Sequence, residues 1–302
     1  MRVQANGIGI EVEDSGGSGA AVLLVMGLGM QLIAWPPALV QALVDAGHRV
    51  VCFDNRDIGR SQYFDHLGVP NLLWAALKVR LGLPLRAPYT VQDMADDAVG
   101  VLDALGIAQA HVVGASMGGM VAQRVALTAP ARVLSLTSIM SSSGARGLPE
   151  ARPEVVRALL RGPRHGGRDA VTDHYVALFR LIGSPAWPPD EALLRQRIAQ
   201  SFERGHHPAG TSRQLLAVAA DTGARAALLG RIGCPTLVLH GKADPLVPFA
   251  CGEDTARRIP GARLVGIEGM GHDLPPAVVD RLLEPMLPHL AAAQVAAGAL
   301  QP

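Results

Sequence analysis

The sequence predicts an α/β fold, in which a mostly parallel central sheet is flanked by helices and interrupted by an inserted helical cap. Three observations lead to this prediction. In the first 140 residues, short β-branched apolar runs alternate with segments whose apolar residues recur at helical spacing. The alternation stops between about 141 and 229, where one helical pattern follows another, and it returns from 230 onward. Strand runs that are apolar on both faces and joined by helices are typical of a parallel sheet covered on both sides.

The predicted elements follow in chain order. Strands are expected at 21–26, 49–53, 111–113, 133–139, 236–240 and 263–267, and core helices at 37–46, 91–105, 117–129 and about 277–290. Cap helices are expected at 154–160, 169–182, 191–203 and 212–220, punctuated by Gly and Pro. We therefore divide the chain into 1–140 (first part of the core), 141–229 (helical cap) and 230–302 (second part of the core). The Ala-rich tail after Leu290 is expected to be a fraying helix end or disordered.

Composition narrows the class of protein. Hydrophobic residues make up 49% of the 302 residues and charged residues 18%, which is too apolar for a disordered chain. No long uninterrupted apolar run suggests a membrane span. The formal charge of +1 favours neither nucleic acid nor an anionic membrane as a partner, so a small-molecule ligand is expected. The oligomeric state is left open.

The amino terminus and the cysteines indicate the compartment. Residues 1–7 lack the basic start and continuous apolar stretch of a secretory signal. Cys52, Cys234 and Cys251 are odd in number and unclustered, so they form neither a disulfide framework nor a four-ligand zinc site. A cytoplasmic protein without a bound metal is therefore expected.

The most informative motif is Gly-x-Ser-x-Gly at 114–118, which lies between a predicted strand and a predicted helix. A serine on so sharp a turn adopts an unfavourable backbone conformation, and Gly114 and Gly118 lack the Cβ atoms that would collide there. The turn exposes the Ser116 hydroxyl at a helix N-terminus, where free N–H groups favour developing negative charge. Ser116 is therefore the candidate nucleophile.

A serine nucleophile requires a histidine base that a buried acid orients. Asp244 follows the predicted strand 236–240, and His272 lies in the loop after the strand 263–267. Both follow carboxyl ends of strands, the edge at which Ser116 also emerges. The order along the chain is serine, acid, histidine. The sequence therefore predicts a catalytic triad of Ser116, Asp244 and His272.

Other residues compete for these roles. Taken alone, Asp244 would be interpreted as a residue that initiates a turn. Asp273 is a rival for the role of the acid, but it is expected to face solvent or cap the next helix. His272 alone could be an ordinary loop histidine. The remaining candidate histidines, His111, His206, His207 and His240, lie on strands or in a cap loop, and no pair has metal-ligand spacing near a carboxylate.

Attack on a carbonyl also requires hydrogen-bond donors for the developing oxyanion. We expect these to be the backbone N–H groups of Met117 and Leu28, the latter in the glycine-containing loop after the first predicted strand. The same loop fails as a dinucleotide-binding loop because Leu32 occupies the position of the third glycine. No cofactor is therefore expected.

The segment 54–61 is dense in charge and follows a predicted strand. It could suggest a phosphate site, but its acids and arginines can instead pair with one another and lock the loop. We favour this structural interpretation and assign the segment no catalytic role.

These landmarks resemble those of the α/β-hydrolase superfamily, over nearly all of the chain outside the cap. Within it, the chain is similar to the serine esterases that include the anthracycline methylesterases. The shared landmarks are Met26-Gly27-Leu28-Gly29, Trp35-Pro36, the 54–61 loop, Gly114-Ala115-Ser116-Met117-Gly118, Asp244-Pro245 and Gly269-Met270-Gly271-His272. The resemblance implies a cofactor-free carboxylesterase with the same triad and backbone donors. Met26-Gly27 replaces the His-Gly with which many members begin the oxyanion loop.

The sequence thus predicts a serine carboxylic-ester hydrolase that acts through an acyl-enzyme. The substrate is expected to be an uncharged, largely apolar ester, because the expected pocket residues are apolar. Besides Met117, they are Met30, Leu32, Leu178, Phe179, Trp187 and Leu246. Lactone hydrolysis is the alternative reaction, since a lactone is a cyclic ester. The alternative from another class is a non-catalytic ligand-binding protein of the same fold.

Overall fold

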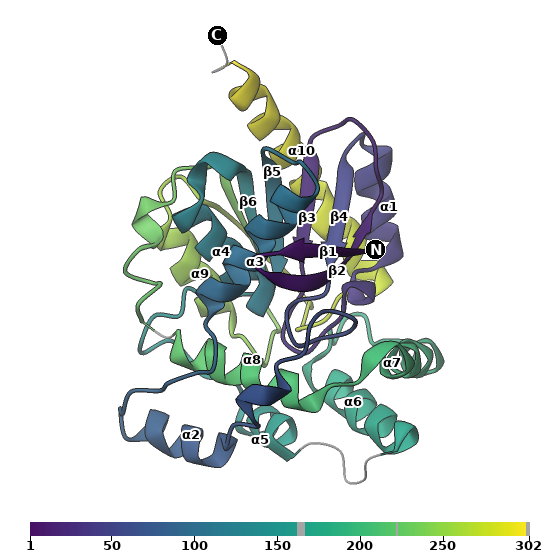
Figure 1. Ribbon diagram of the computed structural model, residues 1–302, viewed down its shortest axis with the longest axis vertical. Coiled ribbons are helices and arrows are strands. Elements are labelled where there is room, and N and C mark those ends of the chain that lie inside the picture. The colour runs from purple at the N-terminus through teal and green to yellow at the C-terminus, as the bar shows by residue number, and fades with distance from the viewer. Residues whose placement is uncertain (162–166, 222, 300–302) are drawn as a thin grey trace.

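The central feature of the molecule is a single twisted sheet (Figure 1). The structure is a computed structural model that describes residues 1–161, 167–221 and 223–299. Within them the strand order is β1-β2-β4-β3-β5-β6-β7-β8. The strands are β1 (Arg2–Ala5), β2 (Ile8–Asp14), β3 (Ala21–Val25), β4 (Arg49–Phe53), β5 (Ala110–Ala115), β6 (Val133–Ile139), β7 (Thr236–Gly241) and β8 (Arg263–Ile267).

The sheet is parallel from β4 through β8. Strands β3 and β5 are buried along their whole length, which explains why β3 is continuously apolar and β5 is apolar except for His111, rather than alternating. The carboxyl ends of β3, β5, β7 and β8 therefore open at one edge of the sheet, and the loops that follow them meet there.

The sequence analysis missed the antiparallel strands β1 and β2, which pair with each other and attach to β4. They are joined by Asn6 and Gly7, both with positive φ (50° and 77°), as a tight hairpin turn requires. The Asn-Gly pair is a hairpin signal that could have found them. Their polar alternation does not match the buried-strand pattern on which the prediction relied.

Helices cover both faces of the sheet. Helices α3 (Val91–Ala104) and α4 (Met117–Thr128) pack in the core cluster on one face, and α1 (Pro37–Asp45) and α10 (Pro276–Gly298) pack in the cluster on the other. Helix α9 (Phe249–Arg258) contacts β7 and β8. This layered arrangement confirms the predicted fold class.

The helical insert lies between β6 and β7. It contains α5 (Pro153–Arg161), α6 (Arg168–Ile182), α7 (Glu191–Gly205) and α8 (Pro208–Ala220), which lie together beyond one end of the sheet (Figure 1). Each of these four was predicted, although α8 begins four residues earlier than expected, at Pro208, because proline is well suited to the first helical turn.

Three helical segments differ from the prediction. Helix α2 (Leu72–Arg80), which packs on α8, and helix α9 were not predicted. The tail after Leu290 is not frayed from that residue, because α10 continues to Gly298 despite Pro285 and Pro288 within it. Residues 300–302 lie outside the described part of the chain.

Candidate active site

Ser116 lies on the turn between β5 and α4 in a strained backbone conformation, with φ 55° and ψ −122°. Such a conformation is rare for a non-glycine residue and is retained only where surrounding contacts enforce it. Two contacts do so here: Ser116 N–H donates to the Ile139 carbonyl (2.9 Å), and the Ser141 hydroxyl donates to the Ser116 carbonyl (2.7 Å). The turn is therefore held from β6 and the residues after it.

The two flanking glycines are required by close backbone contacts. A Cβ atom on Gly114 would lie 2.1 Å from the Gly118 carbonyl oxygen, and one on Gly118 would lie 1.9 Å from the Val25 carbonyl oxygen. Neither neighbour can move, because both are backbone atoms. The Gly-x-Ser-x-Gly spacing thus permits the elbow to pack against β3.

The side chains of Ser116, His272 and Asp244 form one hydrogen-bonded row. His272 Nδ1 lies 2.7 Å from Asp244 Oδ2, and His272 Nε2 lies 2.9 Å from Ser116 Oγ. An ionised carboxylate only accepts hydrogen bonds, so Nδ1 carries the proton and the Nε2 lone pair faces the serine hydroxyl. The three residues come from loops after β5, β8 and β7, and they meet at the edge where those strands end.

Backbone contacts hold the acid and the base of this row. Asp244 Oδ1 accepts hydrogen bonds from the N–H groups of Leu246 (2.9 Å) and Val247 (2.8 Å), which leaves Oδ2 for His272. His272 N–H in turn donates to the Ile182 carbonyl at the end of α6 (2.7 Å). The histidine loop is therefore tied to the helical insert.

Asp273 is buried, contrary to the expectation that it faces solvent or caps the next helix. It is 7% exposed, and its Oδ1 accepts hydrogen bonds from the Ser184 hydroxyl (2.5 Å) and the Ser184 N–H (2.9 Å). Burial raises the pKa of Asp273 to about 6. Pro275, not Asp273, precedes α10 as its N-cap. The Asp273 carboxyl group thus binds Ser184, whereas Asp244 is the acid that contacts the His272 ring.

The predicted oxyanion donors are the N–H groups of Leu28, in the loop after β3, and of Met117, the residue directly after Ser116. Gly27 lies directly against this serine, since a Cβ atom on Gly27 would be 3.1 Å from Ser116 Cβ. Neither Leu28 N–H nor Met117 N–H donates to any acceptor in the described part of the chain. Their role as donors to a substrate oxygen stays a prediction.

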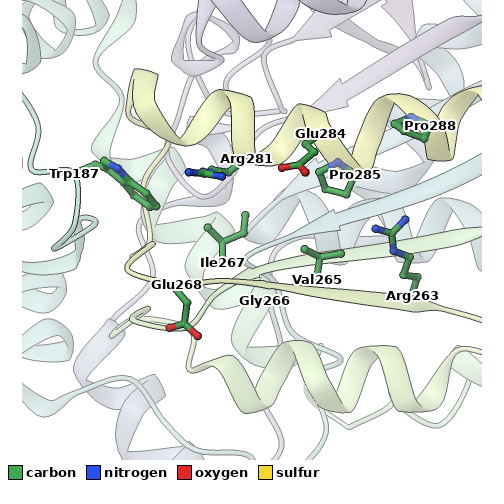
Figure 2. A pocket seen from close by; sticks show the side chains of 10 residues that line it. All are labelled: Trp187, Arg263, Val265, Gly266, Ile267, Glu268, Arg281, Glu284, Pro285 and Pro288. Atoms are coloured by element: carbon green, nitrogen blue, oxygen red, sulfur yellow. The ribbon is translucent and has the colours of Figure 1, made fainter.

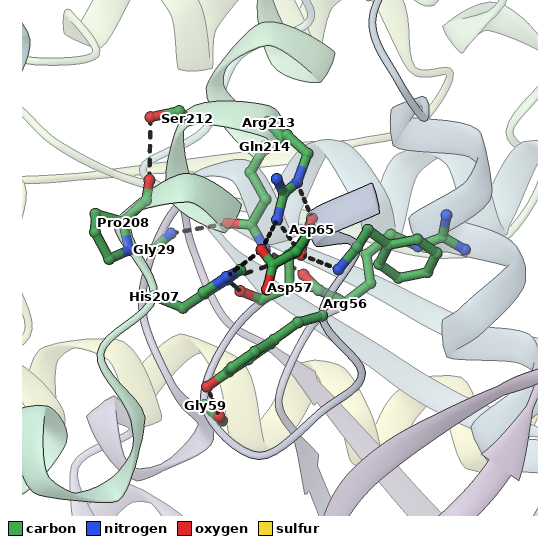
Figure 3. A network of polar contacts seen from close by, with 12 residues as sticks. Gly29, Arg56, Asp57, Gly59, Asp65, His207, Pro208, Ser212, Arg213 and Gln214 are labelled. Atoms are coloured by element: carbon green, nitrogen blue, oxygen red, sulfur yellow. Dashed lines mark hydrogen bonds and ion pairs between the residues drawn. The ribbon is translucent and has the colours of Figure 1, made fainter. Parts of the chain in front are cut away.

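Ion pairs hold the charged loop 54–61 in place. Their partners lie outside the loop, whereas pairing within the loop was predicted. Arg56 binds Asp97 of α3 with two hydrogen bonds (2.6 and 2.7 Å), and Asp57 binds Arg213 of α8 with two of 2.8 Å. Asp54 pairs with Arg204 of α7. The pairs of Asp57 with Arg213 and of Asp54 with Arg204 join this loop of the core to the insert, and Figure 3 shows the first of them.

The histidines outside the row have structural partners. His207 stacks on Tyr63 and contacts the Asp57 carbonyl and Asp65, and His111 contacts Ser135. Buried His240 lies 2.7 Å from the Val247 carbonyl, and burial lowers its pKa. The described residues contain no cluster of three potential metal-ligating side chains.

The six additional expected pocket residues fall into two groups. Leu178, Phe179 and Leu246 pack in one apolar cluster of the insert, and Leu246 lies two residues after Asp244. Met30, Leu32 and Trp187 belong to or pack on the core cluster of α1 and α10, and Leu32 is only 2% exposed. Their contact with a substrate stays a prediction.

A groove of about 500 Å³ lies along β8 and α10, on the outer edge of the sheet (Figure 2). It is lined by Trp187, Arg263, Val265, Gly266, Ile267, Glu268, Arg281, Glu284, Pro285 and Pro288. None of the ten belongs to the hydrogen-bonded row, and Trp187 is the one expected pocket residue among them.

Sequence reasoning missed the polar residues of the insert that hold these loops, namely Ser184, Arg213 and Gln214. All three are buried, and each hydrogen-bonds to a loop of the core. The sequence signal for such a residue is a polar side chain on the apolar side of a predicted helix. Arg213 and Gln214 of α8 are examples. That signal cannot identify the partner.

The chain was compared with known proteins. Residues 20–275 match the family model described as alpha/beta hydrolase fold. Rhodomycin D methylesterase DauP from Streptomyces sp. is 33% identical over 300 residues, which cover 91% of this chain and 92% of that protein.

Two solved structures are also similar. A thermophilic esterase from Thermogutta terrifontis has a TM-score of 0.69 and 25% identity, covering 96% of this chain and 98% of that one. The enol-lactonase from Burkholderia xenovorans has a TM-score of 0.72 and 23% identity, covering 96% of this chain and 100% of that one. At that identity it shows the fold alone.

Among the described residues, no helix combines the length and apolar character needed to cross a bilayer. Sequence and fold agree that the chain belongs to the α/β hydrolase fold family.

Proposed function

We propose that this protein is a serine carboxylic-ester hydrolase that works through a covalent acyl-enzyme. The observation that carries the proposal is the row formed by Ser116, His272 and Asp244, with both hydrogen bonds shorter than 3 Å. In this row a neutral imidazole can accept the serine proton while the carboxylate stabilises the imidazolium that forms.

In the acylation step, Ser116 Oγ forms a bond to the ester carbonyl carbon and its proton moves to His272 Nε2. The carbonyl oxygen becomes an oxyanion, which accepts hydrogen bonds from the N–H groups of Leu28 and Met117. When the carbonyl re-forms, the bond to the alcohol oxygen breaks, and His272 donates its proton to that oxygen. The alcohol leaves and the acyl group stays on Ser116.

Water completes the cycle. His272 Nε2 takes a proton from a water molecule whose oxygen attacks the acyl carbon, and the oxyanion again uses the two N–H groups. Collapse breaks the bond to Ser116 Oγ, which regains a proton from His272. The products are one carboxylic acid and one alcohol for each ester and water consumed.

Two observations support an uncharged, largely apolar ester as the substrate: one concerns its apolar character and the other its ester bond. Leu178, Phe179 and Leu246 form an apolar cluster in the insert, on the side of Asp244. Rhodomycin D methylesterase DauP, a relative with 33% identity over most of its length, is named as a methylesterase, which supports an ester as the substrate.

The test uses a short p-nitrophenyl ester and a fluorophosphonate probe with the intact protein and Ser116→Ala. Ester turnover and covalent labelling are both expected in the intact protein and absent in the variant, because the probe reacts only with an activated serine. Thermal unfolding of both proteins controls for folding. An intact, folded protein that is neither labelled nor active would overturn the proposal in favour of a non-catalytic binding protein.

A further inference from the structure

We propose that Gln214, on helix α8 of the insert, is a positioning residue for the oxyanion loop (Gly27–Met30): it holds the peptide next to the Leu28 N–H donor. This inference rests on the proposed function, because it concerns the donor of that same reaction. The insert then acts on the catalytic step itself and not only on which substrate enters.

Gln214 bridges two loops of the core. Its Oε1 accepts a hydrogen bond from Gly29 N–H (2.9 Å), and its Nε2 donates to the Arg56 carbonyl (2.9 Å), as Figure 3 shows. The side chain is fully buried, so no water competes for either bond. Removing it leaves a buried backbone donor and a buried acceptor unpaired, which costs more than an exposed hydrogen bond.

The contact with Gly29 matters because of the turn that it holds. Met30 N–H donates to the Gly27 carbonyl (3.2 Å), and Gly29 has a φ of 68°. A positive φ at the third position is typical of a type II turn, in which the central peptide can flip to the type I orientation. That central peptide is Leu28–Gly29, and its N–H is the group that Gln214 binds. Gln214 therefore favours one of the two orientations.

The peptide that carries the Leu28 N–H adjoins the one that Gln214 holds, and the two share the Leu28 Cα atom. A flip of the central peptide alone leaves the Leu28 N–H almost in place, but without the Gln214 contact the whole Gly27–Met30 turn can shift relative to Ser116, against which Gly27 lies directly. An oxyanion donor is effective only within a few tenths of an ångström of its position. Loss of the Gln214 contact should consequently weaken stabilisation of the oxyanion more than binding of the substrate.

Helix α8 is a rigid support for this contact. Arg213, the neighbour of Gln214, binds Asp57 with two hydrogen bonds, and both side chains are fully buried. A Cβ atom on Gly210 would lie 2.1 Å from the Asp57 carbonyl oxygen, so the helix backbone sits directly on that loop. The next residue, Thr211, packs against Gly29, where an added Cβ would lie 2.9 Å from Thr211 Cγ2. The helix thus cannot follow the oxyanion loop if that loop moves.

The test compares the intact protein with Gln214→Met, which conserves volume and removes both hydrogen bonds, and with Gln214→Glu, which keeps an acceptor for Gly29. Ser212→Ala is the matched control on the same helix, because among the described residues the Ser212 hydroxyl bonds only to the Pro208 carbonyl, within α8. Each protein is measured for kcat and KM on a p-nitrophenyl ester and for thermal unfolding. Each is also titrated with a trifluoromethyl ketone and the matching methyl ketone.

The trifluoromethyl ketone distinguishes the oxyanion from the ground state. Its carbonyl carbon bonds to Ser116 Oγ, the serine proton moves to His272, and the ketone oxygen becomes the oxyanion. We expect Gln214→Met to lower kcat and trifluoromethyl ketone affinity about 10-fold to 100-fold, with KM and methyl ketone affinity within about 2-fold of the intact protein. Gln214→Glu should recover part of the loss, and Ser212→Ala should be unchanged.

A Gln214→Met protein that keeps its kcat, or that loses affinity for both ketones equally, would overturn the inference while the proposed function stands. If Gln214→Met does not fold, Gln214→Leu, which also removes both hydrogen bonds, takes its place, and a Leu variant without selective loss of the trifluoromethyl ketone overturns the inference. An intact protein that is not labelled by a fluorophosphonate and forms no covalent adduct with the trifluoromethyl ketone refutes the proposed function instead.

Discussion

The Ser184 hydroxyl donates a 2.5 Å hydrogen bond to the buried carboxylate of Asp273 and accepts one of 3.0 Å from the Gly271 N–H. Ser184 follows α6, whereas Asp273 adjoins His272. Together with the bond from His272 N–H to the Ile182 carbonyl, this contact fastens the histidine loop to the insert. The insert therefore supports the proposed base as well as the oxyanion loop.

Asp273→Asn should change how stability depends on pH. Burial raises the pKa of Asp273 to about 6 from its ordinary value of 3.8, so the folded protein holds this proton more tightly than the unfolded chain does. Its contribution to the free energy of unfolding is then fully present below about pH 4 and is lost as pH rises to about 6. The loss is about 3 kcal/mol. Urea unfolding from pH 4 to 7 should show a decline in the intact protein relative to Asp273→Asn; parallel curves would contradict it.

Asp244→Asn should retain the fold and lose activity. An asparagine can still accept the N–H groups of Leu246 and Val247 through Oδ1, but its amide cannot accept the His272 Nδ1 proton at Oδ2. The imidazole is then held in the wrong tautomer, and kcat should fall about 10⁴-fold. Steady-state kinetics, with circular dichroism as the folding control, tests this. A decrease of less than tenfold would show that Asp244 is not the acid of the row.

His111→Phe should remove a pH dependence of the opposite sign. Burial, with smaller effects of His48 and His289, lowers the pKa of His111 to about 4 from 6.5. The unfolded chain therefore binds this proton first, and the contribution to stability, present above about pH 6.5, is lost as pH falls toward 4. Relative to His111→Phe, the intact protein should lose about 3 kcal/mol of unfolding free energy over that range. Chemical unfolding at several pH values measures it, and a constant difference would refute it.

Arg213→Met should destabilise the protein by about 3–5 kcal/mol, because it leaves the fully buried carboxylate of Asp57 without its partner. Arg195→Met is the control: its ion pairs with Asp173 and Glu191 are exposed, so its loss should cost less than about 1 kcal/mol. Denaturant unfolding of both variants makes the comparison. Similar costs would mean that the buried pair is not a specific anchor of α8.

Much of the fold could be predicted from local patterns. The strand from 263 to 267 was predicted with the bounds that it has, and the insert was recognised because strand alternation stops after β6. Buried strands and amphipathic helices reveal themselves by period alone. The hairpin of β1 and β2 was missed because its apolar residues alternate with polar or small ones and form no apolar run, and α2 because exposed leucines obscure its periodicity.

By itself, the sequence determined the α/β alternation, the glycines on which the turn at Ser116 depends, and the chain order of serine, acid and histidine. Their catalytic roles stay proposals. Only the tertiary structure decided that Asp273 is buried against Ser184, that the charged loop pairs with α3, α7 and α8, and that Gln214 reaches Gly29, which lies 185 residues away in sequence. Local patterns record burial and backbone preference, whereas the partner of a buried polar group depends on how distant elements pack.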